Sequence, residues 1–357
     1  MELTSRQRVL YTLTGRQPDM IPITEFLYSR PFYKEMIGYV PEVYNAEDII
    51  KCSQKVGYDL AVIPLGGYSG MTNQDGKGYE YTDEWGIKYR KSEVTWPADA
   101  PIEHPLSNRN DWDNYDFPSP EDGDRTAEIR LAKKMAKETD MAIIGNIRGP
   151  FTPTWLLFGM THFSMLMYDD PALIHEVMRK YTDFFIRGAE MLVDEGADAI
   201  LFADDYGFNT APLIAPAQFK EFVIPYLAEY SVKIKSLGVP LIMHSDGNLN
   251  SLIEMIFDTG ISNYNPVEKA AEMDLAGLRK IYGSNKVFWG NINNKTTLVT
   301  GTPEDIEQEV KECIKAAAGG GHILSSDHSI HDDTKIENIL ALYEAGRKHG
   351  KHPFKFD

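Results

Sequence analysis

The run Ala199-Ile200-Leu201-Phe202-Ala203 is short, apolar along its whole length and rich in aliphatic residues. Strands that are buried on both faces of a parallel sheet have this composition. Segments with the apolar spacing of amphipathic helices flank the run, at residues 171–195 before it and 216–237 after it. This stretch predicts one strand of a parallel sheet whose neighbours are connected through helices.

The same alternation of apolar run and helix-like segment recurs along the chain. The eight runs that we interpret as strands are residues 21–25, 60–64, 141–146, 199–203, 240–244, 262–265, 286–290 and 321–325. Thr302, Pro303 and two acids predict a further helix, which should run to about residue 318 before Gly319-Gly320-Gly321 ends it. Eight strands with helical connections favour an α/β fold of the closed (β/α)8 or TIM-barrel type. An open doubly wound sheet is the alternative, but no Gly-x-Gly-x-x-Gly motif follows the first strand.

Residues 66–118 break this alternation and are rich in Gly, Tyr, Asp and Trp. We interpret them as an insertion over one end of the barrel, with a hairpin around Glu84-Trp85-Gly86. Because no internal repeat or low-complexity tract stands out, we expect residues 1–357 to form a single domain.

Composition restricts the partners of the protein. The chain has 53 Asp and Glu against 36 Lys and Arg, a formal charge of −17, which argues against nucleic acid or an anionic membrane as a partner. The two cysteines, Cys52 and Cys313, have no ligand spacing and suit a reducing compartment. No secretory signal and no apolar run of the ~20 residues needed to cross a bilayer are visible. We therefore expect a cytoplasmic protein.

Polar residues follow nearly every predicted strand, and barrel enzymes place their chemistry at these carboxyl ends. The residues in question are Glu25, Asn146, Arg148, Asp204, Asp205, His244, Asp246, Asn265, Glu268, Asn291, Asp327 and His328. A single polar residue there would mean little, because surface loops are polar as well. The recurrence at almost every strand end predicts a binding or catalytic site.

His244 and Asp246 are the strongest candidates for a pair of metal ligands. Residues two apart at a strand end point the same way, and an imidazole with a carboxylate is a common metal pair. His328, after the last strand, can reach the same barrel mouth, so we predict a metal site of His244, Asp246 and His328. The alternatives are that Asp327 is the carboxylate ligand, or that the acid only orients the imidazole. We expect His331 to face solvent or to form part of a loop cap and not to point inward, and we expect His322 to be structural.

The remaining strand-end residues are assigned to catalysis or substrate binding. Asp204 and Asp205 are adjacent, so at most one should face the pocket. Simple helix capping is the alternative for both. Catalytic candidates are Asp205, Asp204 and Glu25, and substrate-binding candidates are Tyr28, Asn146, Tyr206, Asn265 and Asn291. Aromatic residues that would wall an apolar pocket, if they are not merely core, are Tyr28, Phe32, Tyr68, Trp85, Trp155 and Phe208.

Several segments are similar to known sequences. They are Arg6-Gln7-Arg8-Val9-Leu10, Asp83-Glu84-Trp85-Gly86, Arg148-Gly149-Pro150-Phe151, Met243-His244-Ser245-Asp246-Gly247-Asn248, Asn263-Tyr264-Asn265-Pro266-Val267-Glu268, Trp289-Gly290-Asn291-Ile292 and Gly320-Gly321-His322-Ile323-Leu324. In this order, and over most of the chain, they resemble the uroporphyrinogen decarboxylase superfamily. The resemblance implies a (β/α)8 barrel with its site at the carboxyl ends of the strands.

The superfamily contains decarboxylases and corrinoid-dependent methyltransferases. The decarboxylases carry an Arg-rich segment after the first strand, an Asp after the second and a Tyr after the Gly-Pro turn. The matching stretches here are Phe26-Leu27-Tyr28-Ser29-Arg30, Leu65-Gly66 and Trp155-Leu156, which keep one Arg and lack the Asp and the Tyr. The resemblance therefore favours the methyltransferase branch.

The methyltransferases bind zinc through a His-x-Cys pair and a distant Cys. These positions match His244, Asp246 and His328 here, so both thiolates are replaced. With less charge donated to it, a zinc ion would be a stronger Lewis acid, which suits an ether or amine leaving group. The resemblance thus implies Zn²⁺, a small O-methyl or N-methyl substrate and a partner protein that carries a corrinoid (cobalamin). Asp205 would help as a general acid, and residues 66–118 would form part of the docking surface. Relatives are often homodimers. The alternatives are a decarboxylase-like lyase and a non-catalytic corrinoid-binding protein.

Overall fold

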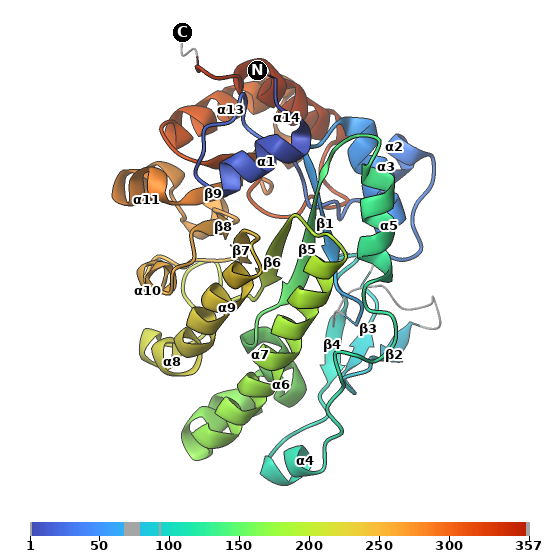
Figure 1. The fold of residues 1–357 in the computed structure, drawn as a ribbon, viewed down its shortest axis with the longest axis vertical. Coiled ribbons are helices and arrows are strands. Elements are labelled where there is room, and N and C mark those ends of the chain that lie inside the picture. The colour runs from blue at the N-terminus through green and yellow to red at the C-terminus, as the bar shows by residue number, and fades with distance from the viewer. Residues whose placement is uncertain (1, 68–78, 93, 355–357) are drawn as a thin grey trace.

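The centre of the protein is a parallel sheet of seven strands, in the order β1-β5-β6-β7-β8-β9-β10 (Figure 1). The computed structural model describes residues 2–67, 79–92 and 94–354. The seven strands are β1 Leu60–Pro64, β5 Ala142–Arg148, β6 Ala199–Ala203, β7 Leu241–His244, β8 Asn263–Asn265, β9 Val287–Ile292 and β10 His322–Ser326. Seven of the predicted runs are therefore strands, and β6, whose residues are all buried, confirms the expectation from its composition.

The prediction of a strand at residues 21–25 is wrong, because this segment does not form a regular strand. Only one parallel bridge forms, between Ile23 and Leu324 of β10. On the other side the Asp59 N–H donates to the Ile23 carbonyl at 2.9 Å, and Thr24 Oγ1 donates to the Leu60 carbonyl at 3.0 Å. Pro22 has no N–H to give, which interrupts the ladder. The segment nevertheless joins the two edges of the curled sheet, as in a TIM-barrel-like fold.

Helices cover the outside of the curled sheet, and the two termini lie at the same end of the molecule (Figure 1). The α-helices are α1 Ser5–Leu13, α2 Arg30–Ile37, α3 Ala46–Val56, α4 Arg109–Asp113, α5 Ala127–Ala136, α6 Phe151–Asp169, α7 Pro171–Asp194, α8 Pro216–Phe222, α9 Ile224–Ser236, α10 Ile253–Asp258, α11 Leu275–Tyr282, α12 Thr297–Thr300, α13 Pro303–Ala317 and α14 Ile336–His349. None of the helices in the described ranges has both the length and the apolar character of a membrane span.

Two of the predicted helices are confirmed and one is divided. Helix α7 agrees with the amphipathic pattern, and α13 begins with the expected cap, in which Thr302 and Asp305 form a capping box. The helix predicted over residues 216–237 is instead α8 and α9, separated at Val223. Pro225 lacks the N–H that a continuous helix would need there, so the second helix starts afresh with proline in its first turn.

A small antiparallel sheet lies within residues 66–118, beside the barrel (Figure 1). Its strands are β2 Glu80–Thr82, β3 Lys88–Arg90 and β4 Ala100–Glu103, and β2 and β3 form a hairpin around Glu84-Trp85-Gly86. Trp85 is buried and contacts the rings of Tyr181 and Phe184 on α7, with centroids 5.0 Å away in both cases. Residues 68–78 of this region, including Tyr68, lie outside the described residues.

Candidate active site

The end of β7 places His244 at the barrel mouth, and the neighbouring strand fixes its ring. His244 pairs with Asn265 of β8 in the parallel ladder, and its Nδ1 is hydrogen-bonded to Asn265 Oδ1. With the proton on Nδ1, the Nε2 atom is left as a lone-pair donor for a ligand. Asn265, predicted to bind substrate, is buried, lines neither of the two cavities described below and instead positions His244.

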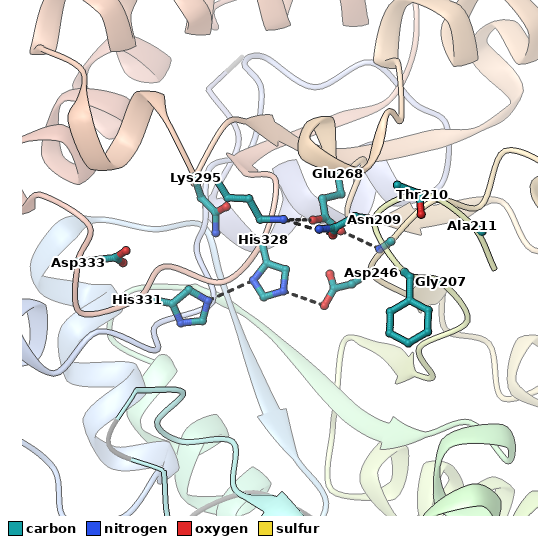
Figure 2. Close-up of a pocket in the computed structure, with 13 residues that line it drawn as sticks. Gly207, Asn209, Thr210, Ala211, Asp246, Glu268, Lys295, His328, His331 and Asp333 are labelled. Atoms are coloured by element: carbon teal, nitrogen blue, oxygen red, sulfur yellow. Dashed lines mark hydrogen bonds and ion pairs between the residues drawn. The ribbon is translucent and has the colours of Figure 1, made fainter. Parts of the chain in front are cut away.

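Asp246 lies between the two histidines of the predicted metal set. Its Oδ2 atom is 3.6 Å from His244 Nε2 and 3.1 Å from His328 Nε2. Its Oδ1 atom is buried and has no hydrogen-bond partner among the described residues. Figure 2 shows His328 directed at Asp246 across the mouth of the barrel. Asp246 therefore lies beside both histidines, although β7 and β10 are far apart in the chain, but the group of ligand atoms that lie mutually close, described next, contains Asp205 and not His328.

Two glycines bring a second carboxylate to the same point. Gly247 has φ of 88°, and a Cβ there would lie 2.4 Å from the backbone of Gly207, so only glycine fits where the loops after β6 and β7 cross. This contact carries Asp205, whose Oδ1 accepts from the Asp246 N–H at 3.4 Å and lies 3.9 Å from His244 Nε2. One ligand atom from each of Asp205, His244 and Asp246 lies within 4.8 Å of the others. Nitrogen and oxygen donors at this spacing fit a divalent cation.

The charges of this cluster depend on one another. Burial alone would lower the pKa of His244, but Asp246, Asp205 and Asn265 outweigh it and raise the pKa to about 9. Attraction to Asp246 raises the pKa of His328 to about 10 against the effect of burial. Burial raises the pKa of Asp246, yet the two histidines pull it well below its usual value. Asp246 is thus held as an anion that favours the protonated forms of both imidazoles, and a bound cation would compete with those protons.

Two cavities meet at this cluster. The inner cavity, about 350 Å³, lies inside the barrel, and the outer cavity, about 670 Å³, opens at its mouth. Asp246, His328 and His331 line both cavities, whereas Asp205 and His244 line only the inner one. The remaining described lining residues of the inner cavity are Phe26, Tyr28, Thr95, Ala98, Asn146, Arg148, Leu201, Ala203 and Ser329. The cluster therefore lies between a partly aromatic inner space and a more open outer one.

The outer cavity contains an ion pair that the sequence analysis did not predict (Figure 2). Lys295 Nζ lies 3.1 Å from Glu268 Oε1, and Glu268 Oε2 accepts from the Gly247 N–H at 2.7 Å. Glu268 was recognised at its strand end, but Lys295 comes four residues after Asn291 in a loop without a motif. Only the fold shows that Lys295 reaches the cavity.

Of the predictions for the residues around His328, some agree with the structure and others do not. His331 points inward, contrary to the expectation: it is half-buried, its Nε2 lies 3.4 Å from His328 Nδ1, and it lines both cavities. Asp327 is turned away and accepts from the N–H groups of Lys269 and Asn294, so Asp246 is the carboxylate beside the imidazoles. His322 is buried and hydrogen-bonded to the Phe288 carbonyl, as expected of a structural residue.

Two catalytic candidates are corrected, because their carboxylates are used within the protein. Asp204 is fully buried and accepts from the N–H groups of Phe151 and Thr152 at the start of α6. Glu25 is buried and accepts from the N–H and hydroxyl of Ser326 on β10. Neither lines either cavity. Of the two adjacent acids after β6, only Asp205 faces the pocket, in agreement with the alternation expected of a strand.

Some of the substrate-binding candidates line a cavity, and others are buried elsewhere. Tyr28 and Asn146 line the inner cavity. Tyr206 is instead buried and donates its hydroxyl to Asp204 Oδ2, and Asn291 donates its amide to the Val267 carbonyl at 2.6 Å. Of the described aromatic candidates, Phe208 lines the outer cavity, whereas Phe32, Trp85 and Trp155 line neither. Phe26 was missed as a wall residue, although its ring stacks on Trp289 and contacts His244.

A curled parallel sheet with this cluster at its carboxyl ends defines an α/β protein of the TIM-barrel-like class. The family described as Uroporphyrinogen decarboxylase (URO-D) matches residues 90–349, and the chain belongs to this family. The chloroplastic uroporphyrinogen decarboxylase of Zea mays is 27% identical over 59% of the chain, but the match spans only 53% of that enzyme's length. The first plant relatives are thus matched over only part of their length.

Other relatives match over nearly the whole chain. A methylcobamide:CoM methyltransferase of Methanosarcina barkeri is 24% identical over 96% of the chain and 98% of that enzyme. The structure of a methyltransferase from Methanosarcina mazei, 20% identical, superposes with a TM-score of 0.78 over 97% of the chain and 99% of its own. The superposition shows the fold, and the full-length relatives support the methyltransferase branch of the family.

Proposed function

We propose that the protein is a corrinoid-dependent methyltransferase, which takes a methyl group from an O-methyl or N-methyl substrate and passes it to a corrinoid held by a partner protein. The observation that carries the proposal is the cluster of His244, Asp246, His328 and Asp205 at the junction of the two cavities. The full-length likeness to a methylcobamide methyltransferase supports it.

The donor set fits a zinc ion, the metal that the methyltransferase branch implies. His244, Asp246 and His328 would hold it, and the unpartnered Oδ1 of Asp246 is an acceptor that such an ion would satisfy. A three-residue set leaves a position open for the substrate. Zinc would supply Lewis acidity at the ether oxygen or amine nitrogen that leaves when the methyl group is taken.

The protein residues then have distinct tasks. Asn265 holds His244 in the tautomer that a ligand needs. Asp205 is placed to give a proton to the leaving oxygen or nitrogen as the methyl–heteroatom bond breaks and its electron pair stays with the heteroatom. The inner cavity would enclose the substrate and exclude water, and the outer cavity would face the corrinoid protein. The insertion at residues 66–118 is our candidate for part of the docking surface.

Metal content tests the cluster. We expect about one zinc per chain in the purified protein and a loss of most of it in His244→Ala and in His328→Ala. His349→Ala is the matched control, because His349, the last residue of α14, pairs with Glu307 of α13, away from the cluster. Normal zinc content in both cluster variants would overturn the metal assignment.

Methyl transfer tests the reaction. The protein is incubated with a reduced corrinoid protein and a panel of methyl ethers, methylamines and methyl thiols, and methylation of the corrinoid is followed by its absorbance. Failure across the panel would contradict the proposal. Turnover of a tetrapyrrole carboxylate would then favour the lyase alternative, and corrinoid binding without transfer would favour the non-catalytic one.

A further inference from the structure

We infer that residues 95–98 of the insertion form a lid where the inner cavity meets the surface, and that the ring of Trp96 latches this lid to the barrel. A ligand would enter the inner cavity when the lid opens, without passing the cluster that contains His244 and Asp246. The inference goes beyond the proposed reaction, because it concerns the route into the cavity and holds for any ligand.

Two side chains of the insertion belong to the wall of the inner cavity. Thr95 and Ala98 line this cavity, and neither lines the outer one. Thr95 is exposed, Ala98 is half-buried, and the neighbouring Val94 is 82% exposed. These residues therefore stand where the inner cavity meets solvent, at a point where a ligand could enter.

Trp96 lies between these two wall residues in the chain but lines neither cavity. It is 7% exposed, and its ring meets the rings of Tyr33 and Tyr44 edge to face, with centroids 5.9 Å and 6.1 Å away. Tyr33 belongs to α2 and Tyr44 comes shortly before α3, so both partners lie outside the insertion. Edge-to-face contacts between aromatic rings are favourable, and these two hold the lid against the barrel.

Hydrogen bonds fasten the lid to the insertion and not to the barrel. The Thr95 N–H donates to Ser92 Oγ at 2.9 Å, and Thr95 Oγ1 donates to the Ala98 carbonyl at 2.8 Å. The Ala98 N–H donates in return to the Thr95 carbonyl at 2.8 Å. Within the part of the chain that the structure describes, no hydrogen bond joins residues 95–98 to the barrel. The lid can therefore move with its internal bonds intact once Trp96 leaves its aromatic site.

The other route into the inner cavity passes the cluster. Asp246, His328 and His331 form the wall that the two cavities share. Asp246 Oδ2 lies 3.1 Å from His328 Nε2, and His328 Nδ1 lies 3.4 Å from His331 Nε2, so these side chains stand in the passage. A cation bound there, or a partner protein over the outer cavity, would obstruct the passage further. Entry at residues 95–98 avoids both obstacles.

The reaction rate of a thiol inside the inner cavity measures how often the lid opens. Ala203→Cys places such a thiol on the wall, because Ala203 lines the inner cavity and not the outer one. The native Cys52 and Cys313 are buried, and burial raises the pKa of each thiol to about 12, so both react slowly. The probe is benzyl methanethiosulfonate, and its attachment is followed by mass spectrometry. Neither substrate nor corrinoid is added, so the result is independent of the proposed reaction.

In the Ala203→Cys protein, we expect Trp96→Ala to raise the labelling rate tenfold or more. Trp96→Phe, which keeps a ring at the latch, should raise the rate less. Phe208→Ala is the matched control, because Phe208 is an exposed aromatic residue that lines only the outer cavity, and it should leave the rate unchanged. If Trp96→Ala does not fold, Tyr33→Leu removes the other side of the same contact and should also speed the labelling.

Four results would overturn the inference. Labelling of Ala203→Cys as fast as that of free cysteine would mean that nothing covers the cavity, and this measurement needs no change at the latch. An unchanged rate in Trp96→Ala, or in Tyr33→Leu where that variant replaces it, would mean that the contact is no latch. A larger increase in Phe208→Ala would place the entrance at the outer cavity. Equal acceleration at Cys313 would trace the effect to general loosening of the protein and not to a lid.

Discussion

The position of Asp205 in the cluster would suit either of two roles, a ligand of the zinc ion or a proton donor. Its carboxylate lies beside both His244 and Asp246, so geometry alone permits a fourth bond to zinc. We propose proton donation for it, since the proposed zinc set of His244, Asp246 and His328 would leave one position open for the substrate, even though Asp205, and not His328, has a ligand atom within 4.8 Å of those of His244 and Asp246. If Asp205 is the proton donor, replacing it should lower the rate of methyl transfer but leave the zinc content unchanged.

In Asp205→Asn we expect zinc to stay bound and methyl transfer to fall by about 100-fold or more, the loss that is typical when a general acid is removed. The measurements are metal analysis and corrinoid methylation. A substrate with an acidic leaving group, such as a nitrophenyl methyl ether, should recover most of the rate, since its oxygen needs no proton. Loss of zinc together with activity would instead make Asp205 a ligand.

Glu25 is the second residue whose chemistry can be tested, and its role is in stability. Burial raises the pKa of Glu25 to about 8, while the hydrogen bonds from Ser326 act in the opposite direction. The unfolded chain binds this proton with a pKa near 4.5. Between these values the native state holds more protons than the unfolded state, so the free energy of unfolding decreases as pH rises from about 4.5 to about 8 and then levels off.

Glu25→Gln should remove this dependence. We expect the difference in melting temperature between Glu25→Gln and the unmodified protein to shift in favour of the variant between pH 5 and pH 8. The difference in the free energy of unfolding between the two proteins would change with pH by at most about 1.4 kcal/mol per pH unit. Glu121→Gln, an exposed glutamate on the surface, provides the comparison. Parallel pH curves for Glu25→Gln and the unmodified protein would show that Glu25 is ionised without penalty.

At the scale of elements, Asp204 connects strand β6 to helix α6. The first turn of α6 has unpaired N–H groups, and no side chain of its own caps them. Asp204 accepts from the N–H groups of Phe151 and Thr152 and from the hydroxyl of Tyr206. A Cβ at Gly149 would lie 2.3 Å from the Asp204 carboxylate, so this carboxylate is held close against the turn before the helix.

Replacing Asp204 by Ala should destabilise the protein by about 2–4 kcal/mol, since three donors lose one buried, charged acceptor. Thermal unfolding measures the loss, and hydrogen exchange should quicken first in α6. Asp205→Ala is the matched control: it removes the adjacent carboxylate, which among the described residues accepts one long bond, from the Asp246 N–H, and lies 3.9 Å from His244 Nε2, so it should cost much less. Equal losses in the two variants would contradict the distinction between cap and pocket residue.

The elements that sequence could predict are those set by local pattern. β1 and β6 are continuous apolar runs, β5 and β9 begin as such runs, and α13 carries its own cap, so local pattern and capping were sufficient. Residues 21–25 have the same composition but contain Pro22 and lie between two sheet edges, which the pattern does not show. Likewise, Pro225 divided a helix whose amphipathic spacing is continuous.

The site could be predicted only as far as strand ends define it. The prediction grouped His244, Asp246 and His328, because each lies at or after the end of a strand and all strand ends surround one barrel mouth. Which way a loop side chain turns depends on tertiary contacts. Asp204 and Glu25 were misassigned because backbone N–H groups and Ser326 take their carboxylates, and His331 was misassigned because the loop after β10 folds back on His328.

At the scale of the whole molecule, one buried aspartate joins the first and last parts of the chain to the sheet. Asp59, directly before β1, is fully buried. It accepts from Ser5 Oγ at 2.7 Å, from Arg8 Nη1 at 2.6 Å and from the Ile23 N–H at 2.8 Å, and lies 3.0 Å from Arg347 Nη2. These partners come from α1, from the irregular segment at residues 21–25 and from α14, so Asp59 compensates for the ladder that Pro22 interrupts.

Asp59→Ala should therefore open the barrel at the seam between β10 and β1. We expect a loss of about 3–5 kcal/mol, because two arginines and a buried N–H lose their common acceptor. Breaking the exposed pair of Glu121 and Arg187 in Glu121→Gln should cost less than about 1 kcal/mol. Hydrogen exchange of residues 3–24 and 336–349 should accelerate in Asp59→Ala, while β6 and β7 stay protected. Uniform acceleration across the sheet would mean that the seam is not a separate weak point and that the barrel unfolds as one unit.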